Sequence, residues 1–232
     1  MRKIGDITIY HGDALEILPT ISPVQIILTD PPYRLTSGGP SGMLGGCLDP
    51  ENYSNDGGIV DCDIDWPDFM PALAKSLPQG HAYIMANNRN VQPMLNAAEA
   101  AGFRFHNLLV WDKISCTANR WYAKNLEFTG FFFRGKAKMI NDCRAKQLIR
   151  CPQVDYSDHP TEKPVPLFEH YIENSSAPGD IVLDPFCGAG TTGVAAMRTG
   201  RKAILIEKNE KWFNVTCDRL EAELNNRQLK TC

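Results

Sequence analysis

Short apolar runs alternate with amphipathic segments along most of the chain. Runs rich in β-branched or aromatic residues predict strands, and apolar residues spaced three or four apart predict helices. The predicted strands cover residues 7–10, 24–28, 81–85, 103–111, 127–133, 181–183 and 202–206. The predicted helices cover residues 14–18, 68–77, 91–101, 164–174, 191–199 and 210–225. This alternation predicts an α/β fold, with helices on both faces of a mostly parallel sheet.

The composition narrows the class of protein. Hydrophobic residues make up 43% of the 232 positions, charged residues 22%, and the net charge is −3, which is typical of a globular protein. The chain shows no long linker or internal repeat, no apolar run near the roughly 18 residues of a membrane span, and no signal peptide at its start. Its eight cysteines form no CxxC pair. We expect an intracellular protein of one domain, without a metal site.

Basic residues gather between residues 113 and 150, which hold nine basic and two acidic side chains. Aromatic residues are interleaved with them, and basic groups beside flat rings are typical of a nucleic-acid interface. A solvated loop next to a core strand would have the same composition. The candidate DNA-contacting residues are Lys113, Arg120, Lys124, Arg134, Lys136 and Lys138.

A glycine-rich loop follows the strand predicted at residues 181–183. Residues 188–193 match the spacing G-x-G-x-x-G, and Glu207 closes the next strand. Such glycines let the backbone approach a nucleotide, and the acid suits ribose hydroxyls. At the mouth of the loop, the Asp184 carboxylate would repel a pyrophosphate but attract an ammonium or sulfonium group. The pattern favours S-adenosylmethionine over NAD, although Asp184 could instead cap a turn.

A second carboxylate followed by proline comes after the strand at residues 24–28. Ligands of parallel sheets bind beyond the carboxyl ends of the strands, so we expect Asp30 to lie beside the Asp184 loop. Because Pro31 and Pro32 lack N–H groups, Asp30 and the Pro31 carbonyl could accept both hydrogens of a planar amine. Tyr33 offers a ring for stacking. The sequence Asp-Pro-Pro alone would also suit a simple turn.

Together, Asp30-Pro31-Pro32-Tyr33 and the segment DPFCGAGTTG at residues 184–193 resemble the amino-methyltransferases that modify exocyclic nitrogens in DNA. The catalytic motif precedes the cofactor motif, as in the β group of that family. The resemblance implies a Rossmann-like, circularly permuted methyltransferase fold with a seven-stranded sheet, one strand antiparallel. It implies a single domain over residues 1–232, with a catalytic half at 1–133, a short basic recognition region at 134–158 and a cofactor-binding half at 159–232.

The resemblance also implies roles for individual residues. Asp13 would approach the adenine of S-adenosylmethionine, Glu207 its ribose, and the HPTEKP segment at residues 159–164 its methionine end. The implied cofactor-binding residues are Asp13, Thr161, Lys163, Asp184, Pro185, Phe186, Gly188, Gly190, Thr191, Thr192 and Glu207. The implied catalytic residues are Asp30, Pro31, Pro32 and Tyr33.

The first letter of the catalytic motif bears on the target base. An aspartate there resembles the adenine-N6 members of the family more than the cytosine-N4 members, which usually begin with serine. We expect methyl transfer to adenine N6 in double-stranded DNA, with the base flipped out, and cytosine N4 is the alternative. An NAD-dependent oxidoreductase and a DNA-binding protein without activity are alternatives of other classes. The resemblance implies the cytoplasm of a bacterial or phage-infected cell, a restriction-modification or phage setting, and a homodimer.

Overall fold

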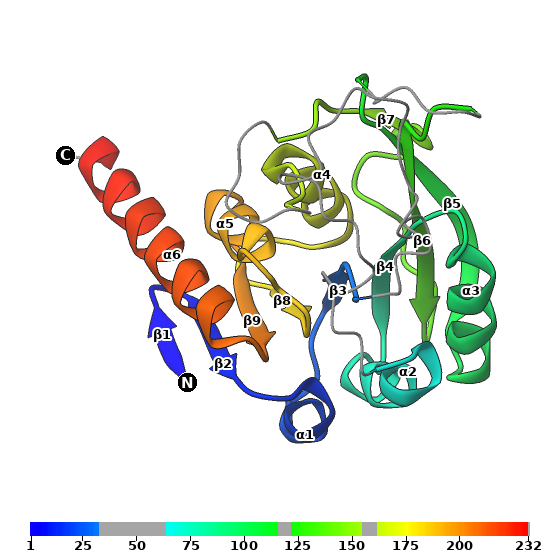
Figure 1. Cartoon of the computed structure of the whole chain (residues 1–232), viewed down its shortest axis with the longest axis horizontal. Coiled ribbons are helices and arrows are strands. Elements are labelled where there is room, and N and C mark those ends of the chain that lie inside the picture. Colours follow the sequence, from blue (N-terminus) through cyan, green and yellow to red (C-terminus); the bar gives the residue numbers. More distant parts are fainter. Residues whose placement is uncertain (33–63, 116–121, 155–161, 232) are drawn as a thin grey trace, which may run out of the picture.

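The computed structural model describes residues 1–32, 64–115, 122–154 and 162–231 (Figure 1). The strands are β1 (Arg2–Ile4), β2 (Ile7–His11), β3 (Ile26–Thr29), β4 (Gly80–Ala86), β5 (Arg104–Asp112), β6 (Leu126–Arg134), β7 (Leu148–Arg150), β8 (Ile181–Asp184) and β9 (Lys202–Glu207). The helices are α1 (Ala14–Ile17), η1 (Leu18–Thr20), α2 (Trp66–Ser76), α3 (Val91–Ala100), α4 (Val165–Ser175), α5 (Thr191–Arg198) and α6 (Glu210–Thr231). Within the described part of the chain, none of the helices combines the length and the apolar character of a membrane span.

The nine strands of the described residues form one sheet, in the order β1-β2-β9-β8-β3-β4-β6-β5-β7. The seven strands from β2 to β5 in this order match the predicted sheet, because only β6 runs antiparallel to its neighbours. Two edge strands extend it: β1 pairs antiparallel with β2, and β7 pairs parallel with β5. The predicted strand number was therefore too low, since each edge strand has three residues and is too short for a periodic signal.

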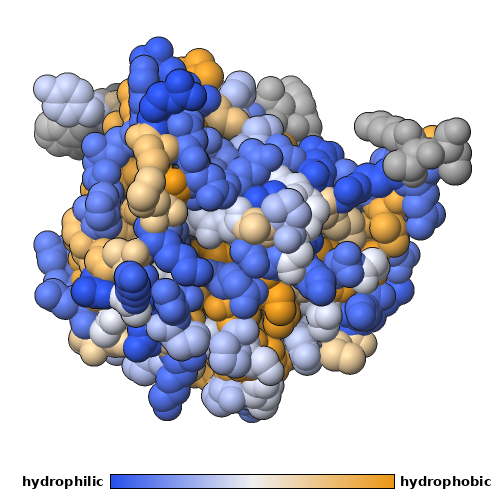
Figure 2. All heavy atoms as spheres, turned by 180° about the vertical axis from the view of Figure 1, so that it is seen from behind, coloured by the Kyte–Doolittle hydropathy of each residue, from blue (hydrophilic) through white to orange (hydrophobic). Residues whose placement is uncertain are grey.

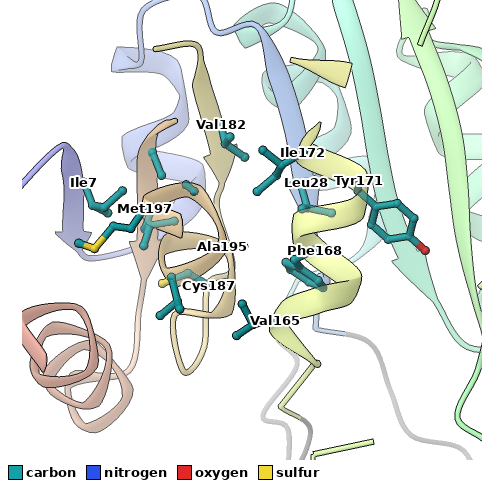
Figure 3. Packing of buried hydrophobic residues seen from close by; sticks show 14 of the residues in the cluster. Ile7, Leu28, Val165, Phe168, Tyr171, Ile172, Val182, Cys187, Ala195 and Met197 are labelled. Carbon is teal, nitrogen blue, oxygen red and sulfur yellow. The ribbon is translucent and has the colours of Figure 1, made fainter. Parts of the chain in front are cut away.

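Helices cover both faces of the sheet, as the alternating pattern predicts (Figure 1). The helices α4, α5 and α6 enclose one apolar core against the sheet, and α1, α2 and α3 enclose a second core on the other face. Figure 3 shows the first core, where Phe168 and Ile172 of α4 lie near Leu28 of β3. Seen from behind, hydrophilic residues dominate the surface of the molecule (Figure 2).

Local signals explain where several helices begin and end. The helix α2 begins two residues before the predicted start, because Asp65 and Asp68 form a capping box with each other's backbone. The helix α3 is followed by Gly102 at φ 86°, the left-handed position that favours glycine after a helix. The helix α6 continues beyond the predicted residue 225 to Thr231. These boundaries leave the carboxyl ends of β2, β9, β8, β3 and β4 at one edge of the sheet.

Candidate active site

The strands β3 and β8 bring the two carboxylate-proline sequences together. They are parallel neighbours, with Ile26 opposite Val182 and Ile27 opposite Leu183. Their carboxyl ends therefore lie side by side, which confirms that Asp30 is next to the loop that begins at Asp184. The ends of β3 and β8 are in direct contact, because the Thr29 hydroxyl donates to Asp184 Oδ1 over 2.7 Å. This is the point of the sheet at which ligands of open α/β folds bind.

The Asp184 carboxylate is buried, with 2% of the residue exposed. Its Oδ1 also accepts from the Phe186 N–H over 3.1 Å, and its Oδ2 accepts from the Thr192 hydroxyl. Burial raises the pKa of Asp184 to about 6, although these hydrogen bonds act in the opposite direction. In this structure Asp184 joins the end of β3, its own loop and the start of α5. Its contact with a cofactor stays a prediction.

The glycine-rich loop is packed tightly against α6. Gly190 has φ 80°, and a Cβ placed on it would lie 2.6 Å from Thr216 Cγ2. The Thr216 hydroxyl donates to the Gly188 carbonyl over 2.6 Å, so Thr216 fixes the loop as well as limiting its space. The other predicted loop residues are buried at the same place: Pro185, Thr191 and Thr192, with Phe186 partly buried. Cys187 is buried in the first core, which supports a packing role for it.

Alanine substitutions at Gly190 and at a control glycine separate the cost of a positive φ from the cost of the contact with Thr216. Gly179 is a matched control, since it has φ 88° but no atom within 4 Å of an added Cβ. We expect Gly179→Ala to cost about 1 kcal/mol of unfolding free energy from backbone strain alone, and Gly190→Ala to cost roughly 2 to 4 kcal/mol. Urea unfolding measures both. Equal losses would show that the contact with Thr216 does not constrain the loop.

The acids implied for adenine and ribose lie at the same edge. Glu207 ends β9, where its Oε2 accepts from the Gly188 N–H over 2.9 Å and its Oε1 from the Asn209 N–H over 2.8 Å. Burial raises the pKa of Glu207. Asp13 caps α1 by accepting from the Leu15 N–H over 2.8 Å, and it lies 3.1 Å from Lys208 Nζ. The structure thus places Glu207 against the glycine-rich loop and Asp13 just beyond the neighbouring strand β2.

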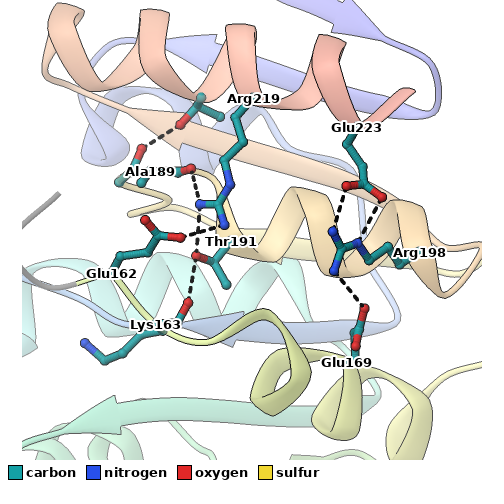
Figure 4. Close-up of polar contacts among 10 residues, drawn as sticks. Glu162, Lys163, Glu169, Ala189, Thr191, Arg198, Arg219 and Glu223 are labelled. Atoms are coloured by element: carbon teal, nitrogen blue, oxygen red, sulfur yellow. Dashed lines mark hydrogen bonds and ion pairs between the residues drawn. The ribbon is translucent and has the colours of Figure 1, made fainter. Parts of the chain in front are cut away.

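The HPTEKP segment is described from Glu162 onward, and Thr161 lies outside the described residues. Figure 4 shows Arg219 reaching from α6 to Glu162, with 2.6 Å between Nη2 and Oε1, and to the Ala189 carbonyl at 2.8 Å. The Thr191 hydroxyl donates to the Lys163 carbonyl over 3.2 Å. These contacts join the segment to the glycine-rich loop, and a shared role in binding the cofactor stays a prediction.

Lys163 is buried and reaches the catalytic motif, with 6% of its side chain exposed. Its ammonium group forms a hydrogen-bonded ion pair with Asp30 Oδ2. Burial raises the pKa of Asp30, and the nearby Lys163 offsets part of that rise. Asp30 Oδ1 is buried and has no hydrogen-bond partner among the described residues. Pro31 and Pro32 follow directly, and Tyr33 lies outside the described residues.

Two residues that belong to no motif, Glu127 and Lys113, also lie near Lys163. Glu127, near the start of β6, has its Oε2 3.5 Å from Lys163 Nζ and its Oε1 2.5 Å from Lys113 Nζ. Lys113 is one of the predicted DNA contacts, whereas no sequence motif predicts a role for Glu127. The antiparallel pairing of β5 and β6 brings them together, because Trp111 is opposite Glu127.

The candidate DNA-contacting residues divide between the two edges of the sheet at which strands begin and end, the one that carries Asp30 and the opposite one. Lys113 and the exposed Lys124 lie between β5 and β6, at the edge where Asp30 lies. Arg134 is opposite Gly80, the first residue of β4, and so lies at the other edge. Lys136 and Lys138 follow it, and the Lys138 carbonyl is 3.1 Å from His81 Nε2. Arg120 lies outside the described residues.

Arg150 is a basic residue that is not among the predicted DNA contacts. It ends β7, beside Asp112 at the end of β5, and its Nε lies 3.3 Å from Asp112 Oδ2. Its side chain is 72% exposed at the edge that carries Asp30. Among the described residues, no group of three or more His, Cys, Asp or Glu side chains is arranged to hold a metal ion.

Two relatives of known type are similar to the chain in sequence. The chain is 30% identical to the DNA adenine methyltransferase YhdJ of Escherichia coli, over 92% of this chain and 82% of that protein. It is 29% identical to the type II methyltransferase M2.DpnII of Streptococcus pneumoniae, over 92% and 89% of the two chains.

Two solved structures extend the comparison. The complex of M1.HpyAVI with S-adenosylmethionine matches with a TM-score of 0.70 and 27% identity, over 92% of this chain and 99% of the other. The cytosine-N4-specific PvuII DNA methyltransferase has a TM-score of 0.70 at 17% identity, over 94% and 91%, and shares the fold. A family model described as DNA methylase, of the N6 and N4 type, matches residues 24–217. The chain therefore belongs to the N6/N4 DNA methylase family.

Proposed function

We propose that this DNA methylase transfers a methyl group from S-adenosylmethionine to the exocyclic N6 of adenine in DNA. The observation that carries the proposal is Asp30 Oδ1, a buried carboxylate oxygen without a hydrogen-bond partner among the described residues. It lies just beyond the end of β3, next to the loop after β8. A buried acceptor left without a donor is costly, so an arriving donor there is strongly favoured. An exocyclic amine supplies that donor.

The described residues suit S-adenosylmethionine better than a dinucleotide. Asp13, Glu207, Asp184 and Asp30 all lie along the edge of the sheet that would hold the cofactor. These carboxylates would repel a pyrophosphate, but they suit ribose hydroxyls, an adenine amine and a positively charged methionine end. When bound, the cofactor would supply an activated methyl group, whose bond to sulfur would break on transfer and leave its electron pair on the neutral sulfur. The matching structure of M1.HpyAVI is a complex with S-adenosylmethionine, which supports the same cofactor here.

The protein's own residues would orient the amine and take up its proton. The nitrogen of an exocyclic amine is a weak nucleophile, because its lone pair is delocalised into the ring. Asp30 Oδ1 and the Pro31 carbonyl would accept its two hydrogens and favour a pyramidal nitrogen with its lone pair directed at the methyl group. After the new N–C bond forms, Asp30 would accept the surplus proton. Its raised pKa suits that role.

Adenine is proposed over cytosine for two reasons. The motif begins with Asp30, which resembles the adenine-N6 members, and the relative YhdJ is named as a DNA adenine methyltransferase. We place the DNA along the edge that carries Lys113, Lys124 and Arg150. Arg134, Lys136 and Lys138 do not enter this proposal, because a duplex that reaches Asp30 would lie at the opposite edge of the sheet.

Duplexes that lack one kind of amine test the choice of base. Methyl transfer from labelled S-adenosylmethionine is measured on random-sequence DNA, on DNA with purine in place of adenine, and on DNA with a pyrimidinone that lacks the amine in place of cytosine. We expect label in the first and third substrates and none in the second. Label in the second substrate would contradict adenine as the target. No label in any of them would contradict the proposed reaction.

A further inference from the structure

Four charged side chains form a continuous row of ion pairs that ends at Asp30. Lys113 Nζ is 2.5 Å from Glu127 Oε1, Glu127 Oε2 is 3.5 Å from Lys163 Nζ, and Lys163 contacts Asp30. They come from the segment after β5, from β6, from the segment before α4 and from the end of β3. Their side chains are 6% to 20% exposed, so water screens them little.

The carboxylate oxygens in this row of ion pairs do not all accept a hydrogen bond. Lys163 donates to Asp30 Oδ2, whereas Glu127 Oε2 is buried and accepts no hydrogen bond from a described residue. The Lys163 ammonium group thus has a second carboxylate oxygen 3.5 Å away that it does not use as a hydrogen-bond acceptor. Lys113 holds the other oxygen of Glu127, and Lys113 Nζ also lies 5.4 Å from the centre of the Trp111 ring.

We propose that Glu127, fixed by Lys113, is a positioning residue that holds the Lys163 ammonium group on Asp30 Oδ2, so that Oδ1 stays open to the target amine. The inference rests on the proposed function, in which Asp30 Oδ1 accepts a hydrogen of that amine. An ammonium group only donates and a carboxylate accepts at both oxygens, so Lys163 and the amine occupy Asp30 together. A buried ion pair contributes to stability only when its geometry is held. Glu127 is the second carboxylate beside Lys163 and keeps its ammonium group in place.

The charges around Asp30 predict that removing Glu127 and removing Lys113 shift the pH dependence of activity in opposite directions. Among the described residues, the titratable groups that face Asp30 and Glu127 are Lys163, Lys113, Asp184 and the Tyr171 phenol of α4. Burial raises the pKa of Asp30, the Glu127 charge raises it further, and the Lys113 charge lowers it. Removing Glu127 therefore lowers the pKa of Asp30, and removing Lys113 raises it.

The test compares Glu127→Gln with Lys113→Met in the full chain. The measured quantity is kcat/KM for DNA as a function of pH, whose acidic limb reports the base of the free enzyme. We expect the limb to move by about one pH unit, toward lower pH in Glu127→Gln and toward higher pH in Lys113→Met. We also expect Glu127→Gln to lose at least about tenfold in kcat/KM at the optimum, because Lys163 loses the charge of one of the two carboxylates that position it.

Two further variants separate positioning from structure. Glu223→Gln is the matched control, since Glu223 has a 14% exposed side chain and pairs with Arg198 of α5, apart from Lys163 (Figure 4). It should leave the acidic limb unmoved. Glu127→Asp keeps the charge and should return the limb toward its wild-type position. Unchanged cofactor affinity in each variant, measured by calorimetry, shows that the site is folded.

Several outcomes would overturn the inference. Acidic limbs that coincide with the wild type in both Glu127→Gln and Lys113→Met, or that move in the same direction, would show that Glu127 does not act on Asp30. A limb in Glu127→Asp that matches Glu127→Gln would show that the charge is not responsible. If the wild type transfers no methyl group, the proposed function itself fails. That result is distinct, because it appears before any substitution is compared.

Discussion

Replacing Asp30 by Ala should lower kcat for methyl transfer by at least about 100-fold, the loss seen when one group that stabilises a transition state is removed. In the proposed reaction Asp30 Oδ1 is the acceptor that holds the amine, and it is buried with no donor among the described residues. The affinity for S-adenosylmethionine should stay within a few-fold of the wild type. Single-turnover transfer and calorimetry measure the two quantities.

Asp30→Asn provides the comparison for this prediction. Its amide keeps the size of the side chain and one acceptor oxygen, but it cannot take up the proton of the amine. We expect an activity between those of Asp30→Ala and the wild type, with the cofactor still bound. In both variants Lys163 keeps Glu127 as a partner, so the protein should remain folded. Activity of Asp30→Ala near the wild-type level would remove Asp30 from the mechanism.

Asp184→Ala should be among the most destabilising single changes in the protein. The substitution leaves the Thr29 hydroxyl, the Thr192 hydroxyl and the Phe186 N–H without their acceptor at a buried position. Each stranded group costs about 1 to 3 kcal/mol, so we expect a loss of roughly 3 kcal/mol or more in the free energy of unfolding. Urea unfolding at pH 7 measures it. A loss below about 1 kcal/mol would contradict the anchoring role of Asp184.

Asp184→Asn tests the charge of the same residue through pH. The folded protein raises the pKa of Asp184 from its ordinary 3.8 to about 6, so it binds this proton more tightly than the unfolded chain does. As pH rises through this window, ionisation of Asp184 therefore lowers the stability of the folded state, by up to about 3 kcal/mol. Asn keeps an acceptor for Phe186 and can donate to a reoriented Thr192 hydroxyl.

The pH dependence is read from the difference between the two proteins. The unfolding free energy of the wild type, relative to Asp184→Asn, should fall from pH 4 to pH 6 and then level off. Other groups with altered pKa values, such as Glu207, are present in both proteins and cancel in the difference. Parallel stability curves across this window would show that Asp184 does not titrate as its burial implies.

Much of the fold follows from local patterns, because long periodic segments carry their own signal. The strand at 127–133 and the helix at 191–199 are predicted within one residue at each end of β6 and α5. Likewise, the two motifs imply that β3 and β8 are neighbours, since one ligand site lies beyond the carboxyl ends of adjacent strands in such sheets. The edge strands β1 and β7 escape prediction, because three residues are too few to carry a periodic signal.

The site is less predictable where it depends on strand direction. Glu127 and Lys113 belong to no motif, and only the register of β5 and β6 places them beside Lys163. The basic cluster shows the same limit, since it is continuous in sequence but β6 carries its two halves to opposite edges of the sheet. Lys113 lies before that strand and Lys136 after it. Composition records how many charges a segment has, and not the direction in which the strand runs.

The modified bases in cellular DNA test the proposed reaction most directly. The protein is expressed in a bacterial strain that lacks its own DNA methyltransferases, and genomic DNA is digested to nucleosides and analysed by mass spectrometry, with Asp30→Ala as the control. We predict N6-methyladenine in cells with the wild-type protein and none in cells with Asp30→Ala. N4-methylcytosine without N6-methyladenine, or neither base despite folded protein that binds S-adenosylmethionine, would contradict adenine-N6 methylation by this site.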